Sequence, residues 1–103
     1  MKKTCAGILF LLIFPVCLMA QDFVVQVNDL IDKGGTENCR KALDIAAKAL
    51  AANPSGYNEN WVMARANRAY GDYAKREGLP GWKDICKDYG KKGMQYAEKA
   101  MTI

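Results

Sequence analysis

Apolar and polar residues recur with the period of an α-helix along most of this chain, and three clusters of turn residues interrupt the pattern. The clusters are Gly34-Gly35, the run Asn53-Pro54-Ser55-Gly56 and Leu79-Pro80-Gly81. Glycine and proline end helices, so the pattern predicts four helices, over residues 22–33, 37–52, 57–78 and 82–102. No stretch has the alternation of a strand. The predicted fold class is therefore all-α.

The same spacing selects the residues that we expect to face the interior of each helix. Thr36 is expected to cap the second helix, since a threonine oxygen there can accept a bond from a free backbone N–H group. The expected inner residues are Phe23, Val24, Val27, Leu30 and Ile31 in the first helix, Leu43, Ala46, Ala49 and Leu50 in the second, Trp61, Ala64, Ala69 and Tyr73 in the third, and Trp82, Ile85, Tyr89, Tyr96, Ala100 and Ile103 in the last.

One segment of the chain occurs twice. Residues 40–50 read RKALDIAAKAL and residues 91–101 read KKGMQYAEKAM, so that basic, small and apolar positions recur in the same order. Ala42, Ala46 and Ala49 of the first copy correspond to small residues of the second. Small residues at this spacing lie on one helix face and allow a neighbouring backbone to come close. A recurring helix of this kind indicates an α-helical repeat array.

The N-terminus has the order of a secretory signal peptide. Lys2 and Lys3 precede the apolar run ILFLLIF at residues 8–14, and a more polar end leads to Gln21. The run is too short to span a membrane. We expect cleavage after Ala20, which gives a signal peptide over residues 1–20 and one domain over residues 21–103 in a periplasmic or secreted protein. The alternative is that the segment is not cleaved and anchors the chain in a membrane. We expect no other association with a membrane.

Composition narrows the function classes. Cleavage leaves 83 of the 103 residues and lowers the formal net charge from +4 to +2, because Lys2 and Lys3 leave with the signal. This balance does not indicate binding to nucleic acid. The chain has no histidine, which excludes His-based catalytic triads and most zinc and copper sites. We therefore expect no metal and no cofactor. We also expect no enzymatic activity, because no pair of carboxylates lies in a setting that suggests acid–base chemistry.

Cys39 and Cys86 are the two cysteines that remain after cleavage. An oxidising compartment permits a disulfide between them. The bond requires Cα atoms within about 7 Å, closer than most helix axes approach. The alternative is that each is a small apolar core residue. The sequence leaves both interpretations open.

The third predicted helix carries the candidate binding residues. Aromatic, amide and basic side chains occur together there, as in the concave grooves with which helical stacks bind peptides or apolar ligands. Arg65 and Arg68 could hold a carboxylate between them, or could form a solvated face paired with Glu59 and Asp72. The candidate groove residues are Tyr57, Asn60, Trp61, Arg65 and Arg68.

Two helices with inner small residues and a closing Asn53-Pro54 resemble the tetratricopeptide repeat. The run Asn53-Pro-Ser-Gly-Tyr-Asn-Glu-Asn-Trp61, the following Ala64-Arg65-Ala66 and Gly71-Asp72 resemble the exported T component of TRAP transporters. The resemblance implies antiparallel helix pairs of an α-solenoid and a role in protein–protein interaction, with a periplasmic solute-binding protein as partner. The alternative function is carriage of a small apolar or carboxylate ligand in an aromatic-lined groove.

About two repeats are present, whereas helical stacks usually need about three. A shift of 51 residues carries Asn53 to position 104, immediately after Ile103. We therefore expect either a shortened form of a longer repeat protein, a final helix that caps the domain, or a contact of Met94, Met101 and Ile103 with another chain, including a homo-oligomer.

The repeated alanines provide a test of the stacking face. Ala46→Leu or Ala49→Leu should lower the free energy of unfolding by about 1 to 3 kcal/mol, because a larger side chain forces the close helices apart. Thermal and urea denaturation measure this change. Wild-type melting of both variants would show that these alanines are not at a helix contact.

Overall fold

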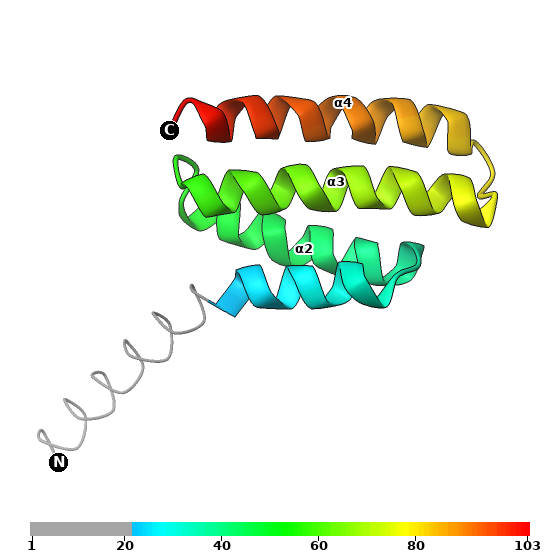
Figure 1. The fold of residues 1–103 in the computed structure, drawn as a ribbon, viewed down its shortest axis with the longest axis horizontal. Helices are drawn as coiled ribbons and strands as arrows, with labels where there is room; N and C mark the ends of the chain where they lie inside the picture. The colour runs from blue at the N-terminus through cyan, green and yellow to red at the C-terminus, as the bar shows by residue number, and fades with distance from the viewer. Residues whose placement is uncertain (1–21) are drawn as a thin grey trace, which may run out of the picture.

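The computed structural model describes residues 22–103, which form four helices and no strand (Figure 1). The first helix covers residues 22–33, and it is followed by α2 (Thr36–Ala52), α3 (Tyr57–Glu77) and α4 (Trp82–Met101). The predicted all-α class is confirmed, and each predicted helix end lies within one residue of the observed end. The predicted signal peptide lies outside the described residues. Within residues 22–103, no helix combines the length and the apolar character needed to cross a bilayer.

Glycines form the break between the first helix and α2. Gly34 and Gly35 have φ angles of 81° and 89°, a conformation that side chains with a Cβ disfavour. Gly35 rather than Thr36 is the N-cap, and Thr36 is the first residue of α2. The backbone N–H and hydroxyl of Thr36 donate to the Glu77 carboxylate at 2.6 and 2.9 Å. The N-terminus of α2, where a negative charge is favourable, is therefore held by the last residue of α3.

The main core lies where the first helix, α2 and α3 meet. Its buried members are Phe23, Val27 and Ile31 of the first helix, Ala42 and Ala46 of α2, and Val62, Met63 and Ala66 of α3. Ala42 and Ala46 are both 0 % exposed, as the repeat predicts for residues at a close helix contact. The small alanines of α2 thus allow the larger apolar side chains of the first helix and of α3 to pack closely against α2.

Helix α4 packs along α3 and runs beside it on the side away from the first helix (Figure 1). No Cα atom of α2 lies within 8 Å of a Cα atom of α4. The approach of α4 to α3 is close: a Cβ built on Gly93 would lie 3.0 Å from the Ala64 carbonyl oxygen, and one built on Gly71 would lie 3.4 Å from the Cα of Cys86. Glycine at these two positions allows the two backbones to approach.

The prediction of the inner face of α3 is wrong except at Ala69, which packs against the main core. Trp61 is 38 % exposed, and Ala64, Ala69 and Tyr73 are half-buried. The buried residues are Asn60, Val62, Met63, Ala66, Asn67, Tyr70, Gly71 and Ala74. Since α3 packs against neighbours on several sides, its buried positions do not form the single stripe that a helix on a surface shows. Ile103, also expected inside, is 58 % exposed.

Two glycines of α4 give a matched pair of variants. Gly93→Ala should lower the free energy of unfolding by about 1 to 3 kcal/mol, because its methyl group meets the backbone of α3. Gly90→Ala should raise it by about 0.5 to 1 kcal/mol, since nothing lies within 4 Å of its added Cβ and alanine favours a helix. Urea denaturation of the two variants measures both changes. Equal effects would contradict the close α3–α4 contact.

Candidate binding groove

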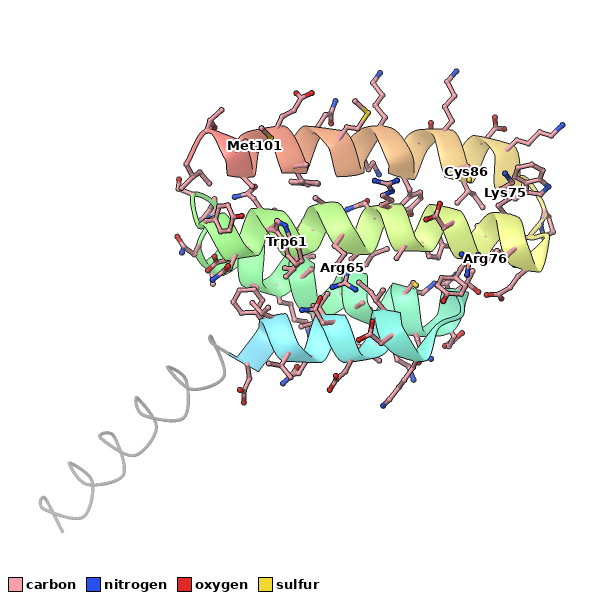
Figure 2. The ribbon with its side chains drawn as sticks, viewed as in Figure 1. Trp61, Arg65, Lys75, Arg76, Cys86 and Met101 are labelled. Carbon is pink, nitrogen blue, oxygen red and sulfur yellow. The ribbon has the colours of Figure 1, made fainter. Side chains whose placement is uncertain are left out.

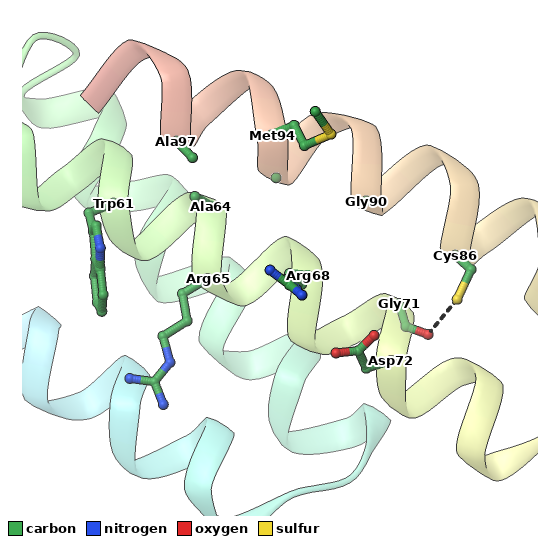
Figure 3. Close-up of a pocket in the computed structure, with 11 residues that line it drawn as sticks. Trp61, Ala64, Arg65, Arg68, Gly71, Asp72, Cys86, Gly90, Met94 and Ala97 are labelled. Atoms are coloured by element: carbon green, nitrogen blue, oxygen red, sulfur yellow. Dashed lines mark hydrogen bonds between the residues drawn. The ribbon is translucent and has the colours of Figure 1, made fainter. Parts of the chain in front are cut away.

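A groove of about 610 Å³ runs between α3 and α4 (Figure 3). We call it the α3–α4 groove. Its lining residues are Trp61, Ala64, Arg65, Arg68, Gly71 and Asp72 of α3 and Cys86, Gly90, Gly93, Met94 and Ala97 of α4. Small residues make up much of the lining, and Met94, 65 % exposed, is its most exposed apolar side chain. The groove is hollow because glycine and alanine stand where larger residues would fill it.

Trp61 and Arg65 form the edge of the groove that faces the first helix, and both point toward that helix (Figure 2). Arg65 Nη1 donates to Asn28 Oδ1 at 2.7 Å, and Arg65 Nη2 lies 3.5 Å from Asp32 Oδ1. The Arg65 guanidinium also lies 5.8 Å from the centre of the Trp61 ring, within the range of a cation–π contact. Arg65 therefore links α3 to the first helix.

The structure separates the two arginines that the sequence grouped as a carboxylate clamp. Arg65 is engaged with Asn28 and Asp32, whereas Arg68 is exposed and makes no ion pair within residues 22–103. The alternative pairing of the arginines with Glu59 and Asp72 is not formed within residues 22–103 either. Glu59 instead accepts a hydrogen bond from the amide of Asn53 at 3.1 Å. Of the two arginines, only Arg68 presents a guanidinium to the groove without a carboxylate partner from the described chain.

Two of the predicted groove residues lie elsewhere. Tyr57 is 53 % exposed at the start of α3 and does not line the groove. Asn60 is 0 % exposed, and its amide nitrogen donates to the carbonyls of Pro54 and Gly56 at 3.0 and 2.8 Å. Asn60 thus fixes the turn between α2 and α3. Trp61, Arg65 and Arg68 are the predicted residues that the groove brings together.

The wall contributed by α4 was not among the predicted groove residues, although Met94 was expected to contact another chain and Cys86 was a candidate for a disulfide. Gly90, Gly93, Met94 and Ala97 line it at helical spacing. Two glycines inside a helical pattern are a signal for a close backbone approach or an open face, and this signal could have pointed to the groove. The sequence alone could not show that Gly90 opens onto free space while Gly93 touches α3.

The tyrosines lie mainly on a second surface, which we call the tyrosine face. It is a groove of about 680 Å³ lined by Arg40, Leu43, Asp44, Ala47, Met63, Asn67, Tyr70, Tyr89, Lys92, Gln95 and Tyr96. The rings of Tyr70 and Tyr89 are 4.7 Å apart, and Lys92 Nζ lies 4.9 Å from the Tyr89 ring centre. A side-chain hydrogen bond with Tyr70 is the main cause of a raised pKa for Arg40. These aromatics therefore pack against each other and against cations.

Cys39 and Cys86 are both free thiols in the structure. Cys39 is in α2 and Cys86 in α4, and no Cα atoms of these helices approach within 8 Å, so the disulfide permitted by the sequence would need the helices to move. Cys39 is 0 % exposed; burial chiefly, and then the charges of Glu77 and Asp72, raise the pKa of its thiol. Cys86 lines the groove, and its thiol donates to the Gly71 carbonyl at 3.1 Å.

Searches of protein-family models, of curated proteins and of solved structures each found no match to this chain. Within residues 22–103, no three His, Cys, Asp or Glu side chains come together as a metal site.

The two thiols should react at different rates with a maleimide. Cys86 should be labelled in the native protein, because it is half-buried at the edge of a groove. Cys39 should be labelled only on unfolding, because burial excludes the reagent and its raised pKa reduces the reactive thiolate. Peptide mass mapping after timed labelling in buffer and in denaturant measures both rates. Absence of labelling at both sites in denaturant without reductant would instead indicate a disulfide.

Proposed function

We propose that this chain is an exported, tetratricopeptide-like helical-repeat protein that binds a partner protein in the α3–α4 groove. The observation that carries the proposal is an open groove between two helices, lined by small and apolar residues and bordered by Trp61 and Arg68. Such a surface suits contact with a protein segment, because backbone can lie close to glycine and alanine while an exposed tryptophan and arginine anchor the contact.

The order of helix contacts supports a repeat arrangement. The first helix and α2 form one antiparallel pair, α3 and α4 form the next, and α3 packs on both members of the first pair. Arg65 bonds to Asn28 across the two pairs. Stacking of successive helix pairs through their first helices is the geometry by which α-solenoids grow.

The alternative function, carriage of a small ligand, is less well supported by the groove. A carrier encloses most of its ligand in an apolar cavity, whereas, among residues 22–103, Trp61 is the one aromatic residue that lines this groove. The two-arginine clamp for a carboxylate is not formed, since Arg65 is held by the first helix. Arg68 remains free to meet a single carboxylate of a partner protein.

The resemblance to exported T components makes a periplasmic solute-binding protein the proposed partner. The signal-like order of residues 1–20 supports this partner, because an exported chain would meet a periplasmic solute-binding protein in the same compartment. The role proposed for this chain is therefore that of a non-catalytic interaction protein associated with solute uptake.

A groove variant with a matched control tests this function. Met94→Lys adds a charge inside the α3–α4 groove, and Gln95→Lys adds the same charge on the tyrosine face one residue later. Wild type and each variant are mixed separately with a purified periplasmic solute-binding protein, and each mixture is examined by native mass spectrometry. We expect a complex with wild type and Gln95→Lys and at least about tenfold weaker binding with Met94→Lys, a loss of about 1.4 kcal/mol.

The same measurement separates the alternatives. A retained small molecule in place of a protein partner would favour the carrier. Equal binding by wild type and Met94→Lys would show that the groove is not the binding site, provided that circular dichroism shows the variant to be folded.

A further inference from the structure

The α4 wall of the α3–α4 groove has a counterpart on α2, because the internal repeat relates these two helices. A shift of 51 residues superimposes α2 on α4 in sequence. Under this shift Cys39, Ala42, Leu43 and Ala46 correspond to Gly90, Gly93, Met94 and Ala97. All four of these α4 residues line the groove. The groove wall is therefore the second copy of a surface that also exists on α2.

On α2 most of this surface is covered, although Leu43 is half-buried and also lines the tyrosine face. Ala42 and Ala46 are 0 % exposed and belong to one core cluster with Val62, Met63 and Ala66 of α3, and Leu43 packs against the same cluster. On α4 the counterpart of Leu43 is Met94, which is 65 % exposed. The difference is that α3 lies on the first surface, and no helix of residues 22–103 lies on the second.

The shift of 51 residues does not extend to the first helix and α3, but each copy of the repeated surface packs on the helix that precedes it in the chain. Ala42 packs in a cluster with Val27 and Ile31 of the first helix, while its counterpart Gly93 packs on Ala64 and Arg68 of α3. The first helix and α2 together form a surface that α3 covers, and we call such a surface a helix seat. The α3–α4 groove is a second helix seat, in which the α4 wall is the repeated part. The occupant of the second helix seat should resemble α3, as a helix with apolar residues at the spacing of Val62, Met63 and Ala66.

We infer that the α3–α4 groove binds a single amphipathic α-helix of the partner protein, which lies antiparallel to α4 as α3 lies antiparallel to α2. This inference rests on the proposed function, since it names the form of the segment that the groove accepts. An extended peptide is excluded by it, because the walls match the surface that α3 covers and helices pack with side chains of one interdigitating between those of the other.

The chain itself supplies the probe. A copy of residues 53–77, appended directly after Ile103, places the turn and the α3 helix after α4 in the register that they have after α2. Met94→Cys reports on the groove and Gln95→Cys on the tyrosine face. Maleimide labelling of each cysteine is followed by peptide mass mapping. With the appended helix, Met94→Cys should be labelled at least about tenfold more slowly, as expected when labelling requires the helix to detach, and Gln95→Cys should be labelled at an unchanged rate.

A control chain carries Ala66→Pro in the appended copy, which breaks the helix but keeps the rest of the segment. Protection of Met94→Cys should then be lost. Protection that persists would mean that the groove accepts an extended chain and would overturn the inference. Unchanged labelling with the intact copy, or equal slowing at both cysteines, would also overturn it.

Two further measurements keep the result decisive. If circular dichroism shows that the chain with the appended copy is unfolded, a separate peptide of residues 57–77 is added to the original chain. The peptide should then slow labelling of Met94→Cys and leave the labelling rate of Gln95→Cys unchanged. If Met94→Cys in the original chain becomes protected as its own concentration rises, the occupant is a second copy and the partner helix is wrong.

The two sets of measurements distinguish failure of the inferred helix binding from failure of the proposed function. Protection by the appended helix without any complex with a solute-binding protein would support the helix seat and contradict the function. A complex that depends on Met94, with no protection by any helix, would support the function and contradict the helix seat.

Discussion

The position of α3 is the constraint on which the rest of the described structure depends. It shares a core with the first helix and α2 through Val62, Met63 and Ala66, and it carries α4 along another side. A helix with neighbours on several sides cannot bury large residues everywhere, because the packed interior leaves no room for them. Small residues at its contacts, on α3 itself and on its neighbours, are the consequence.

Gly93 illustrates how this constraint creates the groove. Its missing side chain lets the α4 backbone approach the Ala64 carbonyl, where a Cβ would lie at 3.0 Å. One turn earlier, Gly90 has nothing within 4 Å of a built Cβ and lines the groove instead. The same residue type thus serves close packing at one position and an open surface at the next.

Polar contacts set the relative placement of the helices where apolar packing is thin. Glu77 at the end of α3 accepts two hydrogen bonds from Thr36 at the start of α2. Arg65 bonds to Asn28 and lies 3.5 Å from Asp32 of the first helix. Because these groups are at least partly exposed, each contact contributes little to stability on its own. Their effect is to fix which groove-side groups remain free, above all Arg68.

The sequence by itself determined the helices, their ends and the small residues of α2. Periodicity and the Gly-Gly, Asn-Pro and Pro-Gly breaks are local signals, and local signals are sufficient to predict where a helix runs. Tertiary structure alone decided which side of α3 is buried, because that depends on neighbours distant in sequence. It turned Asn60 inward to hold a turn, left Trp61 at the edge of the groove and gave Arg65 to the first helix. It also kept every Cα atom of α2 more than 8 Å from those of α4, and so separated Cys39 from Cys86. The positions of the two cysteines in the sequence do not reveal this separation.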